Sequence, residues 1–264
     1  FSDNYQFQYF HNGRATSTMF VRCTLTGSTA GAQGFFLYSG NISHDCCIDC
    51  KVKDVTGFYY NSGTNSSGIL FLRCVAETCR EWGWRLPPGS TYSAASCVEC
   101  VAIDCTLGGF QSRSDGAAGV NEGGSPMLFM NCTAIDCGGD GFSLLVGNSD
   151  SAPNVAFSGC VAIGSAAYGF SNASTHLSFP NMVNCFGFSN TSGNSTGDFE
   201  GAVEALLQDP FTDSANNDLS LNATEAADAL KAASHTNAFD THSTYPFRRL
   251  VENISKAATT TVWS

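Results

Sequence analysis

Residues 100–110, CVAIDCTLGGF, return almost unchanged as residues 132–142, CTAIDCGGDGF. Each copy holds a Cys, an Ala two positions later, a second Cys five positions later and a Phe ten positions later. Self-similarity at a period of about 20–50 residues is the signature of a repeat architecture. We therefore expect the chain to be built from stacked copies of one short unit.

The first Cys of this unit recurs along most of the chain, and we call these residues the pivot cysteines. Successive pivots lie 24–32 residues apart, at Cys23, Cys50, Cys74, Cys100, Cys132, Cys160 and Cys185. The residues three positions before them are all apolar: Phe20, Cys47, Phe71, Cys97, Phe129, Phe157 and Met182. Gly-aromatic pairs follow, ending ten positions after the pivot at Trp84, Phe110, Phe142 and Phe170. The seven copies therefore share one register.

Each copy is predicted to form strands, because short alternating stretches with a Gly turn fit a strand period and no helical periodicity is visible. Copies that are in register with themselves stack best as a solenoid, with like residues about 4.8 Å apart. We expect an all-β solenoid, a parallel β-helix of about seven coils, with a small helical C-terminal segment. The Cys and Ala columns should face inward, and the polar residues just before the pivots outward.

The register resembles the right-handed parallel β-helix repeat of the pectin-lyase-like superfamily, over about residues 15–197. The resemblance implies a fold but no single activity, because that superfamily includes lyases, hydrolases, phage spikes, adhesins and structural proteins. The stretch 85–88, RLPP, is similar to the Arg-x-Pro element of pectate lyases, but Ser90 stands where the second Arg is expected. The Asp cluster and Gly-His-Gly of polygalacturonases are also missing from the sequence. The sequence favours a protein that is not an enzyme.

Composition divides the chain into three parts. Residues 1–14 are predicted to form an N-terminal aromatic strand or cap, residues 15–197 the parallel β-helix, and residues 198–264 a helical C-terminal cap or docking arm. Cysteines stop after Cys185, and amphipathic helices are expected over about 198–207, 222–233 and 248–257. A cap over the last coil and an arm that docks on a neighbouring subunit both stay open.

The chain is acidic, with 23 Asp and Glu against 12 Lys and Arg and a formal charge of −11. No Lys or Arg occurs between Arg113 and Lys231. A charge of this sign disfavours nucleic acid and anionic lipid as partners. No run approaches the roughly 18 apolar residues of a membrane span. We expect neither nucleic-acid binding nor a membrane span.

The 13 cysteines are an odd number, so at least one has no partner within the chain. Cys-x-x-Cys pairs could suggest zinc, but the repeat accounts for their spacing, and no metal is expected. Stacked cysteines point in parallel directions that suit disulfides poorly, so we expect mostly free, buried thiols. Cys46 lies outside the columns, on the opposite face from Cys47. It is the candidate for an exposed or intermolecularly paired thiol.

Eight Asn-x-Ser/Thr sequons occur, a mild excess over chance. They are Asn41, Asn65, Asn131, Asn172, Asn190, Asn194, Asn222 and Asn253, with Asn131 the weakest acceptor. A surface rich in Ser, Thr and Asn explains them as well as glycosylation does. Glycosylation would imply a secreted, extracellular or cell-surface protein.

Two further groups of residues are candidate sites. Asp104 and Asp136 occupy one position in adjacent coils, where we expect them to form turns, with catalysis or calcium binding as the alternatives. Trp82 and one of Tyr59 and Tyr60 could form a platform on which a sugar ring stacks. Apart from this calcium alternative, no cofactor is expected.

The function expected first is that of a non-enzymatic, extracellular structural glycoprotein, displayed on a surface or self-assembling into filaments. Its termini would make the end-to-end contacts, and head-to-tail contacts between rods do not close. The alternatives are a glycan-binding adhesin or spike and a polysaccharide lyase or glycoside hydrolase of the same fold.

Overall fold

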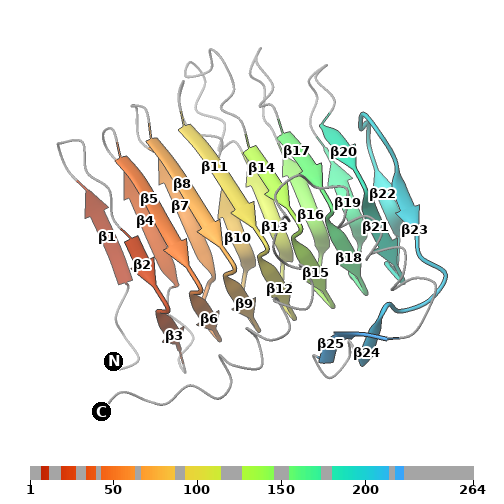
Figure 1. The fold of residues 1–264 in the computed structure, drawn as a ribbon, viewed down its shortest axis with the longest axis horizontal. Helices are drawn as coiled ribbons and strands as arrows, with labels where there is room; N and C mark the ends of the chain where they lie inside the picture. The colour runs from red at the N-terminus through yellow and green to blue at the C-terminus, as the bar shows by residue number, and fades with distance from the viewer. Residues whose placement is uncertain are drawn as a thin grey trace.

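The computed structural model describes residues 7–11, 19–27, 34–39, 43–62, 67–86, 93–113, 127–145, 155–173, 180–213 and 218–222. These residues form an all-β parallel solenoid and contain no helix, which confirms the predicted fold class. The strands follow one another along the long axis of the molecule in chain order (Figure 1).

Three parallel sheets make up the solenoid, and we call them A, B and C. The eight strands of sheet A are β1 (Phe7–His11), β4 (Phe35–Ser39), β7 (Phe58–Ser62), β10 (Trp82–Leu86), β13 (Gly108–Arg113), β16 (Asp140–Leu145), β19 (Tyr168–Asn172) and β22 (Gly193–Thr196). The seven strands of sheet B are β2 (Met19–Val21), β5 (Ser43–Ile48), β8 (Ser67–Leu72), β11 (Ser93–Val98), β14 (Met127–Met130), β17 (Val155–Ser158) and β20 (Asn181–Val183). The eight strands of sheet C are β3 (Thr24–Thr26), β6 (Lys51–Lys53), β9 (Val75–Glu77), β12 (Val101–Ile103), β15 (Thr133–Ile135), β18 (Val161–Ile163), β21 (Cys185–Phe188) and β23 (Val203–Ala205).

Like residues lie opposite like residues, as the repeat predicts. Phe110 pairs with Trp84 and Phe142 in sheet A, and Ala102 pairs with Ala76 and Ala134 in sheet C. Along sheet A the aromatic rings stack in parallel, with centroids 4.6 Å apart for Trp84–Phe110 and 4.8 Å apart for Phe110–Phe142. Ring spacing therefore matches strand spacing, so one ladder of rings fills one lobe of the core.

The core holds the columns that the sequence placed inside. Its buried members include six of the seven pivot cysteines, the Ala column and the Phe columns of sheets A and B. The first pivot, Cys23, is half-buried, as are Phe20 and Leu25 beside it. The first coil is thus packed on only one side by described residues.

Two columns of turn residues have a left-handed backbone that the sequence reading missed. The first lies between sheets B and C, where Asp49, Arg73 and Glu99 have φ near +53°. The second follows sheet C and includes Asp54, Thr78, Asp104 and Asp136, with φ between 48° and 56°. Asn, Asp and Gly enter this region most readily, which explains why acids recur there. Asn131, expected to face outward, is buried in the first column.

The C-terminal prediction was wrong over residues 198–207, which contain strand β23 (Val203–Ala205) and no helix. β23 pairs in parallel with β21, and Phe199 and Val203 pack against the core. The reason is the open edge of sheet C, whose unpaired backbone groups accept one more strand. An antiparallel hairpin follows, made of β24 (Phe211–Asp213) and β25 (Asp218–Leu221). The helices expected over 222–233 and 248–257 lie outside the described residues, apart from Asn222.

The parallel sheets extend past both ends of the 15–197 span, through β1 at one end and β23 at the other. Every link from sheet A back to sheet B lies partly or wholly outside the described residues, so the count of about seven coils stays a prediction. Where the chain is described, no helix has the length and hydropathy that crossing a membrane would require.

Candidate functional site

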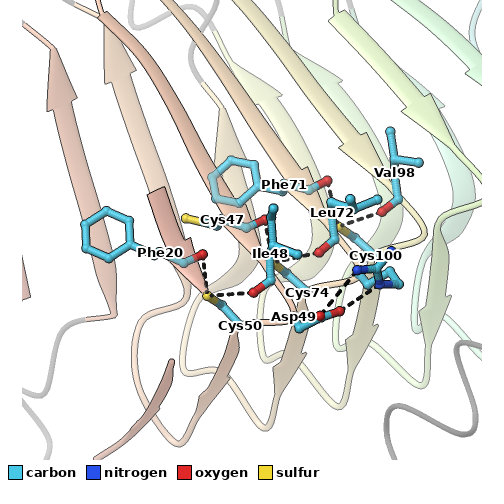
Figure 2. Close-up of polar contacts among 11 residues, drawn as sticks. Phe20, Cys47, Ile48, Asp49, Cys50, Phe71, Leu72, Cys74, Val98 and Cys100 are labelled. Carbon is cyan, nitrogen blue, oxygen red and sulfur yellow. Dashed lines mark hydrogen bonds and ion pairs between the residues drawn. The ribbon is translucent and has the colours of Figure 1, made fainter. Parts of the chain in front are cut away.

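The pivot cysteines form a ladder of thiols that bond to backbone carbonyls of neighbouring coils. Figure 2 shows its first steps, in which Cys50 Sγ donates to Phe20 O at 3.5 Å and Cys74 Sγ donates to Cys47 O at 3.3 Å. Cys100, Cys132 and Cys160 continue the pattern, at 3.2–3.4 Å from a carbonyl of the coil before. Each thiol therefore supplies a weak donor to a buried carbonyl as well as filling space.

All 13 cysteines are free thiols in this structure. Burial raises the pKa of Cys97 and Cys132 well above the usual value for a thiol, which keeps these groups protonated. Cys46 is half-buried on the outer face of β5, opposite Met19 and Leu70. Burial, followed by the nearby Cys50, raises the pKa of Cys46 as well. A raised thiol pKa lowers the fraction of reactive thiolate, so Cys46 is accessible but not activated.

Asp104 and Asp136 lie in the second left-handed column, directly after β12 and β15. Burial and the charge of Glu77 raise the pKa of Asp104. Burial and the charges of Asp104 and Asp209 raise the pKa of Asp136. The turn position accounts for both acids, and neither lines the cleft described next.

Two of the three aromatic candidates meet in one cleft on the outer side of sheet A. Tyr59 and Trp82 line a depression of about 240 Å³, together with Thr56, Glu81 and Arg85. β7 and β10 carry Tyr59 and Arg85 opposite each other in register, and the Arg85 guanidinium lies 5.3 Å from the centre of the Tyr59 ring. Tyr60 follows in β7, but its side chain lies outside what the structure describes.

Gly108 explains how Trp82 sits at this cleft. A Cβ at Gly108 would lie 2.2 Å from the Trp82 ring, so only glycine lets the indole approach β13 this closely. The ring is thereby packed against β13, while the residue as a whole stays partly exposed. The sequence predicted Trp82 and Tyr59 but not Arg85, which lies in β10, or Glu81, which directly precedes it; their closeness to Trp82 in the sequence was the available signal. An aromatic face with a guanidinium and a carboxylate is a set of groups that suits a sugar ring and its hydroxyls.

The structure describes five of the eight sequon asparagines, and their side chains are hydrogen-bonded within the fold or buried in it. Asn172 Nδ2 donates to Asp198 O at 2.6 Å, and Asn222 Nδ2 donates to Asp209 O and Phe211 O. Asn190 Nδ2 donates to Ala162 O and to the side chain of Asn194, both at 3.0 Å. The weakest sequon, Asn131, is only 9% exposed.

A glycan is attached through Nδ2, so Asn172, Asn190 and Asn222 would have to give up hydrogen bonds to carry one, and Asn131 would have to leave the interior. The other three sequons, Asn41, Asn65 and Asn253, lie outside the described residues. Among the five described sequons, glycosylation of Asn131, Asn172, Asn190 or Asn222 would therefore disturb the fold.

Within the described ranges, no three His, Cys, Asp or Glu side chains are grouped so that they could hold a metal ion. Comparison with protein-family models, with curated proteins and with solved structures found no match to this chain. The fold and the sites thus rest on the residues themselves.

Proposed function

We propose that this protein is a non-enzymatic, extracellular structural solenoid whose copies associate end to end into filaments. The observation that carries the proposal is the pair of free edges of sheet C. β3 ends the sheet on one side and β23 ends it on the other, and within the described residues neither has a further neighbour in that sheet. β23 of one copy can therefore continue the parallel ladder by pairing with β3 of the next.

The side chains at the two ends support this pairing. At the first coil, Phe20 and Leu25 are only half-buried, and at the last coil Val203 is. Stacking the ends would bury these apolar groups in the way that neighbouring coils already do.

Charge also differs between the ends. The segment 114–230 contains thirteen Asp and Glu and no Lys or Arg, whereas the segment 1–113 contains eight residues of each sign. Asp198, Glu200 and Glu204 lie exposed near the last coil, and Arg22 lies exposed at the first. Head-to-tail contact brings unlike charges together, while head-to-head or tail-to-tail contact does not.

Ala205→Pro tests the proposal. Leu206 N–H donates to Gly187 O, so alternation along β23 points the Ala205 N–H away from β21. Proline removes that outward donor without breaking the β21 pairing. We expect the wild type to form rods of increasing length with concentration in electron micrographs and in sedimentation, and Ala205→Pro to stay short.

Ala205→Ser, which keeps the N–H, is the control and should assemble like the wild type. Raised salt should shorten the rods because it screens the charges of the two ends. A wild type that stays unassembled at high concentration and low salt contradicts the proposal.

The cleft on sheet A favours glycan binding as a second candidate function. Its aromatic ring, guanidinium and carboxylate are the supporting observation. Screening the protein on a glycan array would show binding that Trp82→Ala removes and that Leu145→Ala, an exposed change elsewhere on sheet A, leaves intact. Absence of binding by the wild type would remove this candidate.

The same proposal includes three further points: membership of the pectin-lyase-like superfamily, a right-handed coil, and a secreted or cell-surface location. The parallel stacked sheets agree with the first, and the sequons at Asn41, Asn65 and Asn253 with the last. Intact mass of the protein from its native source, before and after glycosidase treatment, would reveal attached glycans.

A further inference from the structure

The outer face of sheet B carries two columns of mostly apolar side chains along the whole length of the sheet. Pairing register defines the first column as Met19, Cys46, Leu70, Ser96, Leu128, Ala156 and Asn181. The second column is Val21, Ile48, Leu72, Val98, Met130, Ser158 and Val183. We call these fourteen residues the B face.

These side chains point away from the core. The residues between the two columns, such as Phe71, Cys97 and Phe129, are fully buried, so strand alternation directs the columns outward. Met19 is 65% exposed and Val183 is 49% exposed, whereas the residues between the two ends of the sheet are only partly exposed. A continuous apolar face of this length is comparable to the largest apolar patch of a typical monomer, and such patches are often functional.

Charge and periodicity identify the kind of partner. The B face contains no Asp, Glu, Lys or Arg, although the chain carries a formal charge of −11. Two copies can therefore meet at this face without placing like charges in contact. The side chains also form rows repeated at about 4.8 Å, and the rows of an identical sheet have the matching spacing.

We propose that the B face is the contact surface between two copies of this chain packed side by side, sheet against sheet. Such a contact uses the same surface on both copies and closes as a dimer. Seven strands by two columns give a footprint of roughly 400–500 Å² per copy, at the small end of specific interfaces. We expect a weak dimer, because interfaces of this size belong mostly to transient complexes, with a dissociation constant on the order of 100 μM.

This contact differs from end-to-end association, and one variant pair separates the two. Leu70→Lys places a charge at the centre of the B face, whereas Leu145→Lys makes the same change at an exposed position of sheet A. Both variants keep the inner columns intact, and circular dichroism with a thermal melt verifies their folding.

Sedimentation velocity and small-angle X-ray scattering across a concentration series, in the Ala205→Pro background, measure the outcome. We expect a dimer whose longest dimension is close to that of the monomer, at least tenfold weaker in Leu70→Lys and unchanged in Leu145→Lys. A monomer up to about 1 mM, a dimer twice as long as the monomer, or equal weakening by both variants would overturn the proposal. If the protein is monomeric, residues 223–264 or a different protein are the remaining candidates to cover the B face, while end-to-end association would still be judged by its own test.

Discussion

Trp84 carries a polar atom into a column of rings that otherwise consists of phenylalanine. It is fully buried between Phe58 and Phe110, and its Nε1 has no hydrogen-bond partner among the described residues. An unsatisfied buried N–H costs about 1–3 kcal/mol, while a Trp-to-Phe change leaves a small void with a similar cost. We expect Trp84→Phe to alter the free energy of unfolding by less than about 1 kcal/mol, measured by urea denaturation.

Phe110→Ala is the comparison for this test. It should lower the free energy of unfolding by about 3–5 kcal/mol, because it removes a ring that stacks on a neighbouring ring on both sides. A loss of that size for Trp84→Phe would mean that the indole N–H has a partner.

Asp136 makes stability depend on pH. Its pKa in the folded protein is raised, so as pH rises above about 3.9 the unfolded chain ionises first and gains stability relative to the fold. The loss of folding stability caused by Asp136 is complete at pH values above its pKa in the folded protein and is absent at pH values below its pKa in the unfolded chain. We expect Asp136→Asn, which suits the left-handed turn equally well, to raise the melting temperature at pH 7 and to leave it unchanged near pH 3.

Asp140→Asn is the control, because it removes a carboxyl charge elsewhere in the same coil. It should change the melting temperature less than Asp136→Asn does at pH 7. An increase in melting temperature for Asp136→Asn that is equally large at pH 3 and pH 7 would show that the carboxyl charge is not the cause.

At the scale of the element, the left-handed turns are the feature with the clearest energetic cost. Thr78 is β-branched and has φ of 50°, a conformation that costs a non-glycine residue about 1–2 kcal/mol. Asn adopts it more easily. Thr78 Oγ1 also donates to Asp54 Oδ1, and this charge-assisted bond offsets the backbone cost. We therefore expect Thr78→Asn to change the free energy of unfolding by less than about 1 kcal/mol and Asp104→Thr to lower it by about 1–2 kcal/mol. Equal effects of the same sign in urea denaturation would contradict this.

The thiol ladder predicts a particular pattern of cysteine reactivity. In the native protein only Cys23 and Cys46 are partly exposed, so a thiol reagent should modify at most these two, and slowly because their pKa values are raised. After unfolding, all 13 cysteines should react. A count below 13 in denaturant without reductant would reveal disulfides and contradict the free ladder.

The strands and their register could be predicted because the repeat brings identical residues to identical places. Turns were expected at Asp104 and Asp136, but the left-handed backbone of the turn columns could not be predicted, because a residue such as Arg73 has no side-chain signature that separates it from an exposed polar residue. The helix expected over 198–207 failed for a different reason. Its apolar spacing also fits residues that close the last coil, and pairing with β21 decided between the two.

The candidate sites divide in the same way. Tyr59 and Trp82 could be placed together, because adjacent coils carry them at nearby positions of one sheet. The engagement of Asn172 and Asn190 could not be foreseen, because their partners, Asp198 O and Ala162 O, lie 26 and 28 residues away and meet them only through coil stacking.

For the molecule as a whole, stability should vary along the solenoid axis. A coil in the middle packs on two neighbours, whereas the first coil packs on one, and its strand β3 is largely exposed while all three residues of β12 are buried. In hydrogen exchange we expect the amides of β3 to exchange at least tenfold faster than those of β12 and β15. The measurement is made at a concentration where the protein is monomeric, because contact between copies would protect the first coil. Equal protection of β3 and β12 in the monomer would contradict the prediction.

Unequal spacing around the coil has a practical consequence. Ten residues separate the pivot from the sheet A aromatic in Cys74–Trp84, Cys100–Phe110, Cys132–Phe142 and Cys160–Phe170, whereas 16, 22, 18 and 15 residues separate each aromatic from the next pivot. In these four coils the length is constant on two sides and varies on the third, where the chain returns from sheet A to sheet B; the first two coils differ, with 12 residues from Cys23 to Phe35 and 8 from Cys50 to Phe58. A foreign peptide grafted at 114–126 should leave the melting temperature nearly unchanged, whereas the same graft between Cys100 and Phe110 should prevent folding. Peptides inserted at this side of successive coils would then lie in a row along the solenoid, about one strand spacing (~4.8 Å) apart.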